Sequence, residues 1–157
     1  MKRPSIFLFA ISICFILGCS TSGTSPMSGK EKRQYEQKVL DYSFENLYGS
    51  AIAVLQDQGY IIENSDSLGG LIVGEKHGEN RTGLFVKYRD VFDCSINLRQ
   101  IAKKQTAIRY KIQKKTYVYN GYSEAVDSVE EIIDPEVSAA FYNALKTEAE
   151  RRKSGFN

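Results

Sequence analysis

The stretch FENLYGSAIAVLQDQG (44–59), followed by YIIENSDSLGGLIVGEK (60–76), indicates the fold class, because its pattern changes from the period of a helix to that of strands. Its first apolar side chains recur at the i, i+3, i+4, i+7 spacing of one face of an α-helix. These side chains are Phe44, Leu47, Tyr48, Ala51, Val54 and Leu55. Ser43 is a candidate N-cap that can accept a hydrogen bond from the backbone N–H of Asn46. Gly59 can end the helix in a left-handed conformation.

Strands are predicted after this helix. The runs 60–65 and 71–76 flank a glycine-rich turn and predict a β-hairpin. Residues 92–98 and 108–112 alternate apolar with polar side chains, which indicates two half-buried strands. The polar residues 103–105 predict the turn between them.

Four stretches have weaker patterns. Residues 35–42 are interpreted as a short first strand, and the polar stretch 77–83 is expected to be a loop. Residues 84–91 are either the beginning of the next strand or a separate turn. Residues 116–131 show no clean period.

A second helix is predicted near the end of the chain. Asp134 can cap it, Pro135 suits its first position, and an apolar stripe follows. The stripe consists of Val137, Ala140, Phe141, Ala144 and Leu145. We therefore predict a single α+β domain over residues 34–155, with an antiparallel sheet of about four or five strands and two amphipathic helices packed on one face.

The first residues are typical of an export signal. Lys2 and Arg3 precede an uncharged apolar run of 12 residues, 6–17, which is short for a bilayer-spanning helix of about 20 residues. The following ILGC (16–19) resembles the lipobox of bacterial lipoproteins. This resemblance implies that residues 1–18 are a signal peptide and that Cys19 becomes lipidated at the new N-terminus. The alternative is an uncleaved membrane anchor with a chance cysteine.

A tether and an address follow from the same region. Residues 20–29 are rich in Ser, Thr and Gly, so residues 19–33 are predicted to be the lipidated cysteine and a flexible tether. The lipoprotein resemblance implies sorting to the outer membrane, facing the periplasm, because Ser20 rather than Asp follows the cysteine. The alternative location is the inner membrane.

The net charge argues against a nucleic-acid partner. The chain has 21 Lys and Arg and 19 Asp and Glu. Lys2 and Arg3 lie in the expected signal peptide, so the remaining chain would be neutral. A neutral domain has no long-range field that would gather nucleic acid.

Two segments resemble known envelope proteins. Residues 51–66 with 70–74 are similar to a helix–turn–hairpin motif of small, uncharacterised bacterial envelope lipoproteins, and residues 133–145 are similar to the final helix of such a group. A more distant similarity is to the helix-grip domains of BamC-type lipoproteins, which accompany the outer-membrane β-barrel assembly machine. The resemblance implies a helix-grip-like fold. Its motifs are mostly packing and turn residues, so they carry no activity.

No catalytic, metal or cofactor motif is recognised, and we predict that the chain is not an enzyme. His77 is the only histidine and is expected to be a solvated loop residue. Cys14 would leave with the signal peptide and Cys19 would carry lipid, which leaves Cys94 alone. Cys94 lies in the alternating strand pattern, so we predict a buried core thiol.

Two clusters remain open. The acidic residues of the C-terminal half are interpreted as a solvated loop, with a calcium site as the alternative. They are Glu124, Asp127, Glu130, Glu131 and Asp134. Tyr117, Tyr119 and Tyr122 suit an interaction surface for protein or glycan, or else an edge strand whose rings pack on the sheet.

These observations favour a non-enzymatic, lipid-anchored accessory domain with an envelope protein as its partner. The alternative is a small-ligand-binding lipoprotein with a cavity between helix and sheet. A hydrolase would need clustered titratable groups in a cleft.

Overall fold

Residues 28–155 are described by a computed structural model, and residues 1–27 and 156–157 lie outside the described part. The elements follow in the order α1 (Gly29–Glu36), β1 (Gln37–Leu40), α2 (Phe44–Asp57), β2 (Ile61–Asp66), β3 (Leu71–Thr82), β4 (Lys87–Ala102), β5 (Gln105–Tyr119), β6 (Glu124–Ile132) and α3 (Pro135–Lys153). The α+β class with an antiparallel sheet is confirmed. The expected counts are wrong, because residues 28–155 form six strands and three helices.

The helix α2 begins and ends where its sequence predicts. The Ser43 hydroxyl accepts a hydrogen bond from the backbone N–H of Asn46 at 3.4 Å. Gly59 follows the helix with φ of +83°, which only glycine adopts without strain. The predicted stripe is buried at Leu47 and Leu55. Local capping and the apolar period therefore agree over this segment.

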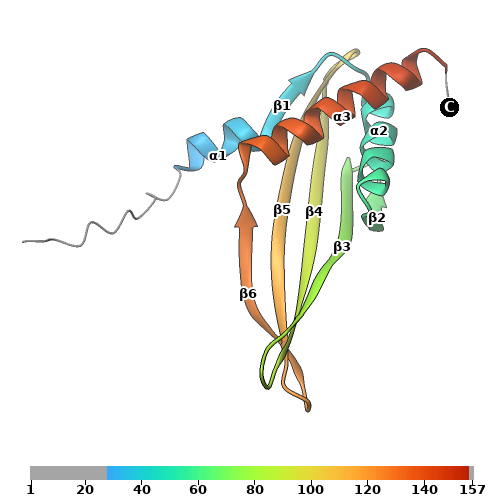
Figure 1. Cartoon of the computed structure of the whole chain (residues 1–157). Helices are drawn as coiled ribbons and strands as arrows, with labels where there is room; N and C mark the ends of the chain where they lie inside the picture. Colours follow the sequence, from blue (N-terminus) through green and yellow to red (C-terminus); the bar gives the residue numbers. More distant parts are fainter. Residues whose placement is uncertain (1–27, 156–157) are drawn as a thin grey trace, which may run out of the picture.

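The strands β4 and β5 form the centre of the sheet and are its longest members, with 16 and 15 residues. The strand order is β1-β5-β4-β3-β2, and every pairing is antiparallel. Two strands share the remaining edge of β5: β1 pairs with residues 106–109 and β6 with residues 112–119 (Figure 1).

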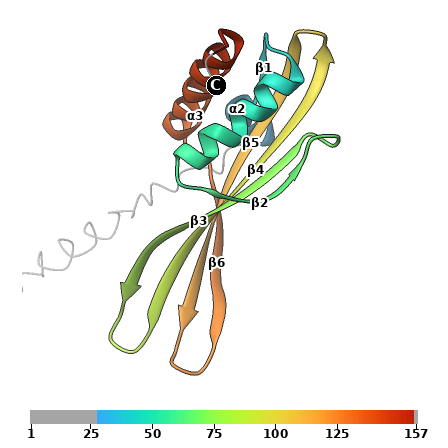
Figure 2. The same cartoon turned by 90° about the vertical axis from the view of Figure 1, so that its right-hand side faces the viewer.

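The core lies between the sheet and the helices α2 and α3 (Figure 2). Alternate residues of β4 and β5 point into it, as their sequence period predicts. They are Cys94, Ile96, Leu98, Ile108, Tyr110 and Ile112. The Tyr110 ring stacks on Phe141 of α3 with centroids 3.9 Å apart. The Asn46 side chain of α2 donates a hydrogen bond to the Ala149 carbonyl of α3 at 3.0 Å, which ties the two helices together.

The strands continue beyond the helices as two hairpins (Figure 2). We call residues 77–91 and 115–129 the arms. The prediction of a loop at 77–83 is wrong, because β3 runs to Thr82 with a bulge between His77 and Asn80. None of the three described helices covers this part, so its strands need no apolar alternation, and the sequence period cannot reveal them.

The second arm also contains more strand than expected. The stretch 116–131 had no clean period, yet β5 runs to Tyr119 and β6 begins at Glu124. The acidic residues before Asp134 therefore lie mainly in a strand, and the expected acidic loop is wrong. Pairing with β5 holds β6 in place. Polar residues suit such a strand, because both of its faces are exposed to water.

Helical structure begins at Gly29, before the expected first strand at 35–42. Ser28 and Glu31 form a capping box: the Glu31 N–H donates to the Ser28 hydroxyl at 3.3 Å and the Ser28 N–H to the Glu31 carboxylate at 2.8 Å. Residues 29–33, which the sequence places in the tether, therefore lie in α1. The strand β1 falls within the expected range.

Gly70→Ala is expected to destabilise the fold more than Gly121→Ala. Both glycines have positive φ, +70° and +92°, where an L-residue costs about 1–2 kcal/mol. A Cβ at Gly70 would also overlap the Leu98 carbonyl oxygen, whereas Gly121 has nothing within 4 Å. Urea unfolding should show the larger loss for Gly70→Ala. Equal losses would contradict the importance of this backbone contact.

Candidate interaction surface

The face of the sheet opposite α2 and α3 is open, and its character changes along the strands. Near the helices it carries charged side chains such as Arg109 and Lys111, which alternate with the core residues of β5. In the arms it carries Tyr117 and Tyr119, which lie two residues apart on β5 and so share this face. The structure therefore brings two of the three predicted tyrosines together.

The strand β6 adds two valines beside the tyrosines. Val126 lies opposite Tyr117 and Val129 lies opposite Lys115 in the β5–β6 register. The two valines are 52% and 54% exposed. We call Tyr117, Tyr119, Val126 and Val129 the arm patch.

An arginine borders the arm patch and holds one ring in place. The Arg89 guanidinium lies 4.7 Å from the centroid of the Tyr117 ring. Its Nη2 and Nε donate to the Glu124 carboxylate at 3.0 and 3.1 Å. This arrangement combines a cation–π contact with a two-point ion pair, so the patch has an ordered, charged rim.

The alternative of an edge strand is wrong for Tyr117 and Tyr119, because β5 lies between β4 and β6 at this level. The Arg89 guanidinium lies over the Tyr117 ring, which is partly buried. The Tyr119 hydroxyl donates to the Gly121 carbonyl at 3.0 Å. Tyr122 lies apart, in the β5–β6 turn, and is 99% exposed. A role of these residues in binding stays a prediction.

The turn between β3 and β4 carries exposed apolar residues that sequence reasoning missed. Leu84 and Phe85 are 94% and 90% exposed. Turns normally contain Gly, Pro, Asn, Asp or Ser, so two large apolar residues in a turn are a signal that could have singled out this position. The sequence alone does not show this signal clearly, because residues 84–91 fit the beginning of a strand as well as a turn. We call Leu84, Phe85 and Tyr122 the tip residues.

A buried carboxylate joins the arms on the face toward the helices. The Thr116 hydroxyl donates to Asp90 Oδ1 at 2.8 Å, and Arg81 donates to both carboxylate oxygens at 3.0 and 3.1 Å. Lys114 Nζ lies 3.3 Å from Oδ2. Burial opposes ionisation of Asp90, but the hydrogen bonds from Thr116, Lys114 and Arg81 outweigh it and lower its pKa. These groups therefore have a structural role, linking β3, β4 and β5.

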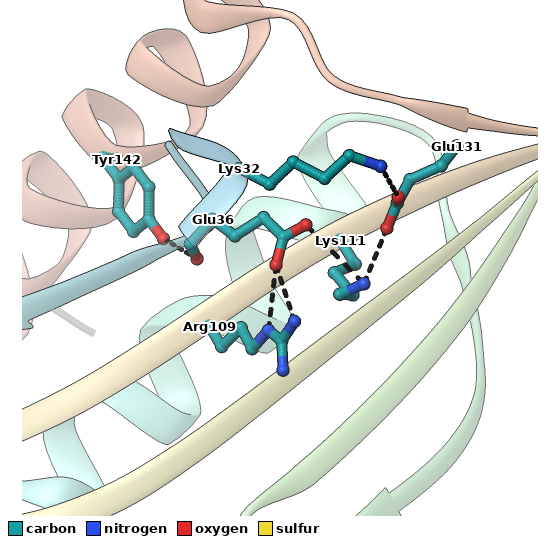
Figure 3. A network of polar contacts seen from close by, with 6 residues as sticks. All are labelled: Lys32, Glu36, Arg109, Lys111, Glu131 and Tyr142. Carbon is teal, nitrogen blue, oxygen red and sulfur yellow. Dashed lines mark hydrogen bonds and ion pairs between the residues drawn. The ribbon is translucent and has the colours of Figure 1, made fainter. Parts of the chain in front are cut away.

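A second polar network fastens α1 to the sheet (Figure 3). Arg109 donates from Nη2 and Nε to Glu36 Oε2 at 2.8 and 3.0 Å. Lys111 Nζ lies 2.6 Å from Glu131 Oε1 and 3.6 Å from Glu36 Oε1. Lys32 of α1 pairs with Glu131 Oε2 at 2.9 Å.

A buried tyrosine completes this attachment from the helical side. The Tyr142 hydroxyl of α3 donates to the Glu36 carbonyl at 2.5 Å (Figure 3). The Lys38 ammonium lies 4.6 Å from the centroid of the Tyr142 ring. Burial raises the pKa of Tyr142. It therefore stays protonated as a hydrogen-bond donor.

Among the described residues, no hydrogen bond joins Cys94 to His77, the nucleophile and base candidates. Cys94 is buried, as predicted, and burial raises the pKa of its thiol to about 12, so it is no thiolate nucleophile at neutral pH. His77 lies in β3 rather than in the expected loop, and its Nε2 is 3.6 Å from Glu75 Oε1. Over residues 28–155, no group of three His, Cys, Asp or Glu side chains is placed to hold a metal ion.

The hollows give little support to a ligand cavity. A pocket between α1, α3, β5 and β6 has room for about 10 Å³, the space of about one water molecule. Larger hollows of about 290 and 400 Å³ lie open on the polar face around Asn97 and Arg109. A drug-sized ligand usually occupies an enclosed, mostly apolar pocket of about 300–1,000 Å³.

The predicted lipidation site, Cys19, lies outside the described residues. Within the described range, no helix has the length and apolar character needed to cross a membrane. Searches with the whole sequence find no protein-family model and no curated protein that match this chain.

Glu131→Gln is expected to weaken the dependence of stability on acid. Hydrogen bonds from Lys111 and Lys32 lower the pKa of Glu131 below its ordinary value of 4.5. Its contribution to stability is therefore complete above that value and is lost as the pH falls through the lower, folded-state pKa. In urea unfolding, the variant's free energy of unfolding should be lower by about 1 kcal/mol at neutral pH and should decline less steeply below about pH 5.

The matched control is Glu130→Gln. Glu130 is the exposed neighbour of Glu131 and takes no part in the network of Figure 3. This control should keep the natural decline in acid. A Glu131→Gln variant with an unchanged decline would refute the electrostatic role of the network.

Proposed function

We propose that this chain is a lipid-anchored, non-enzymatic accessory domain that binds an envelope protein through the arm patch. It would face the periplasm from the outer membrane, with the inner membrane as the alternative. The observation that carries the proposal is the pair of uncovered arms, which present tyrosine and valine side chains on an open sheet face. The anchor rests on the apolar run 6–17 and the following Cys19.

The composition of the arm patch supports a protein partner. Aromatic side chains and arginine are enriched at protein interfaces, and tyrosine combines a large apolar ring with a hydrogen-bonding tip. Tyr117 and Tyr119 supply the rings, and Arg89 with Glu124 supplies a charged rim. A standard interface buries about 800 Å² on each partner, so contacts would extend over neighbouring parts of the open face.

Anchoring would add to a weak contact. A tethered domain meets a partner in the same membrane at a raised effective concentration, so a modest patch can suffice. We also propose the finer helix-grip-like description, because α3 lies across an antiparallel sheet (Figure 1). The small-ligand alternative draws no support from the pocket of about 10 Å³ beside α3.

Cys19→Ser is expected to release the protein from the membrane fraction. One acyl chain gives only marginal binding, whereas several chains on one cysteine give stable anchoring. Mass spectrometry should find acyl groups on the N-terminal peptide of the natural protein. Cys14→Ser is the matched control, since Cys14 would leave with the signal peptide, and it should change nothing. An unmodified N-terminus would overturn the anchor.

A photo-reactive amino acid at Val126 is expected to capture a protein partner in cells, whereas the same group at Val39 is not. The two valines match in type and exposure, 52% and 50%, but Val39 lies on β1, away from the arms. The adduct should weaken in the Cys19→Ser background, because the partner is membrane-bound. Equal adducts at both positions would contradict the arm patch, and an adduct independent of Cys19 would contradict tethering.

A further inference from the structure

The most unusual surface feature is the apex of the two arms. Leu84 and Phe85 form the corner of one hairpin and Tyr122 stands at the corner of the other, all almost fully exposed. Single exposed apolar residues are ordinary, but three large ones at the corners of two turns are not. Local rules broken without a structural gain are expected at functional sites.

The two corners lie side by side. Residues from both hairpins line one hollow of about 260 Å³. They are residues 82–87 from the first arm and Tyr119, Asn120 and Gly121 from the second. Both hairpins end at the same end of the molecule, opposite the helices (Figure 2). The tip residues therefore form one apex rather than two unrelated turns.

The side chains behind the apex are those that suit a membrane–water interface. Tyr88 lies just behind the corner of the first arm, and the Arg81 guanidinium lies 5.6 Å from the centroid of its ring. Lys87 is the first residue of β4. Tyrosine is enriched at the level of lipid headgroups, and Lys and Arg place their charges there while their stems lie along apolar surface.

We infer that the tip residues enter the headgroup region of the bilayer to which the domain is tethered. The apex would be a second membrane contact besides the acyl chains. Leu84 and Phe85 would reach the acyl boundary, with Tyr88, Tyr122 and the cations at the headgroups. This inference rests on the proposed lipid anchor, and membrane entry can fail while the anchor stands.

The shape of the apex favours a lipid surface over a protein. A specific protein interface buries about 800 Å² per partner, whereas the exposed apolar surface of the apex consists of three side chains in two turns. A bilayer requires no matching shape, and a tethered domain needs only a weak additional contact. The arm patch lies on the side of the arms, so a partner can still approach it.

The reach of the chain fits this arrangement. The segment from Tyr122 to Glu131, at about 3.3 Å per residue, spans about 30 Å and ends where Lys32 of α1 contacts Glu131. The chain from Cys19 to Ser28 can span at most about 33 Å. The apex can therefore reach the same bilayer that would hold Cys19.

A single tryptophan can test the inference, because the chain contains none. The full-length Phe85→Trp variant is purified from cell membranes, with its N-terminal modification, and reconstituted into phosphatidylethanolamine–phosphatidylglycerol vesicles. The matched control is Leu68→Trp, since Leu68 is also a turn residue and is 99% exposed, but it lies in the β2–β3 turn, away from the apex. Flotation reports the anchor, and tryptophan emission with quenching by brominated acyl chains reports the depth of each site.

The expected result is flotation of both variants, with blue-shifted emission and several-fold stronger bromine quenching for Phe85→Trp alone. Adding Leu84→Glu to Phe85→Trp should reverse the shift. Flotation with equal, water-like emission from both sites would overturn membrane entry and leave the anchor standing. If the same emission is measured in native membranes, a blue shift of Phe85→Trp there but not in the lipid vesicles would assign the apex to a protein partner instead. Failure to float would overturn the anchor, and membrane entry with it.

Discussion

The pairing of β4 with β5 is the constraint on which the rest of the molecule depends. It runs from Lys87 opposite Tyr119 to Ala102 opposite Gln105, with a single irregularity near the turn. A slip of one residue would turn the buried Ile96 and Ile108 toward water, so burial of one face fixes the register. The same register also sets Arg89 beside Tyr117 on the open face. The core and the tyrosines of the arm patch therefore lie on opposite faces of the same β4–β5 pair.

The remaining edge of β5 is divided between β1 and β6, and α1 is fastened at that division. Partly buried ion pairs join Glu36 to Arg109 and Lys32 to Glu131, so α1 is attached to both the sheet and β6. An isolated helix of 8 residues is marginal in water. Its stability must come from its caps and from these contacts. A tether entering α1 would thus be connected to the strand that leads toward the apex.

Within residues 28–155 no helix covers the arms, and polar groups supply part of their cohesion. The Asp90 carboxylate of β4 is satisfied by Arg81 of β3 and by Thr116 and Lys114 of β5, so the network joins three strands. A buried, fully bonded carboxylate fixes geometry more than it adds stability. Because this network lies on the face toward the helices, the opposite face keeps its tyrosines and valines available. The proposed contacts with protein and membrane use different sides of the same arms.

Sequence patterns correctly predicted α2 and its caps, the cap of α3 at Asp134, the buried thiol of Cys94 and the alternating centres of β4 and β5, because local propensity and burial on one face leave a readable period. The sequence also singled out Tyr117, Tyr119 and Tyr122, but it could not show that the first two lie on a sheet face and the third in a turn. The arms, β6, the first turns of α1 and the apex became evident only from the three-dimensional structure. Those segments are ordered by cross-strand pairing and by ion pairs between residues far apart in the chain, and such partners leave no local period.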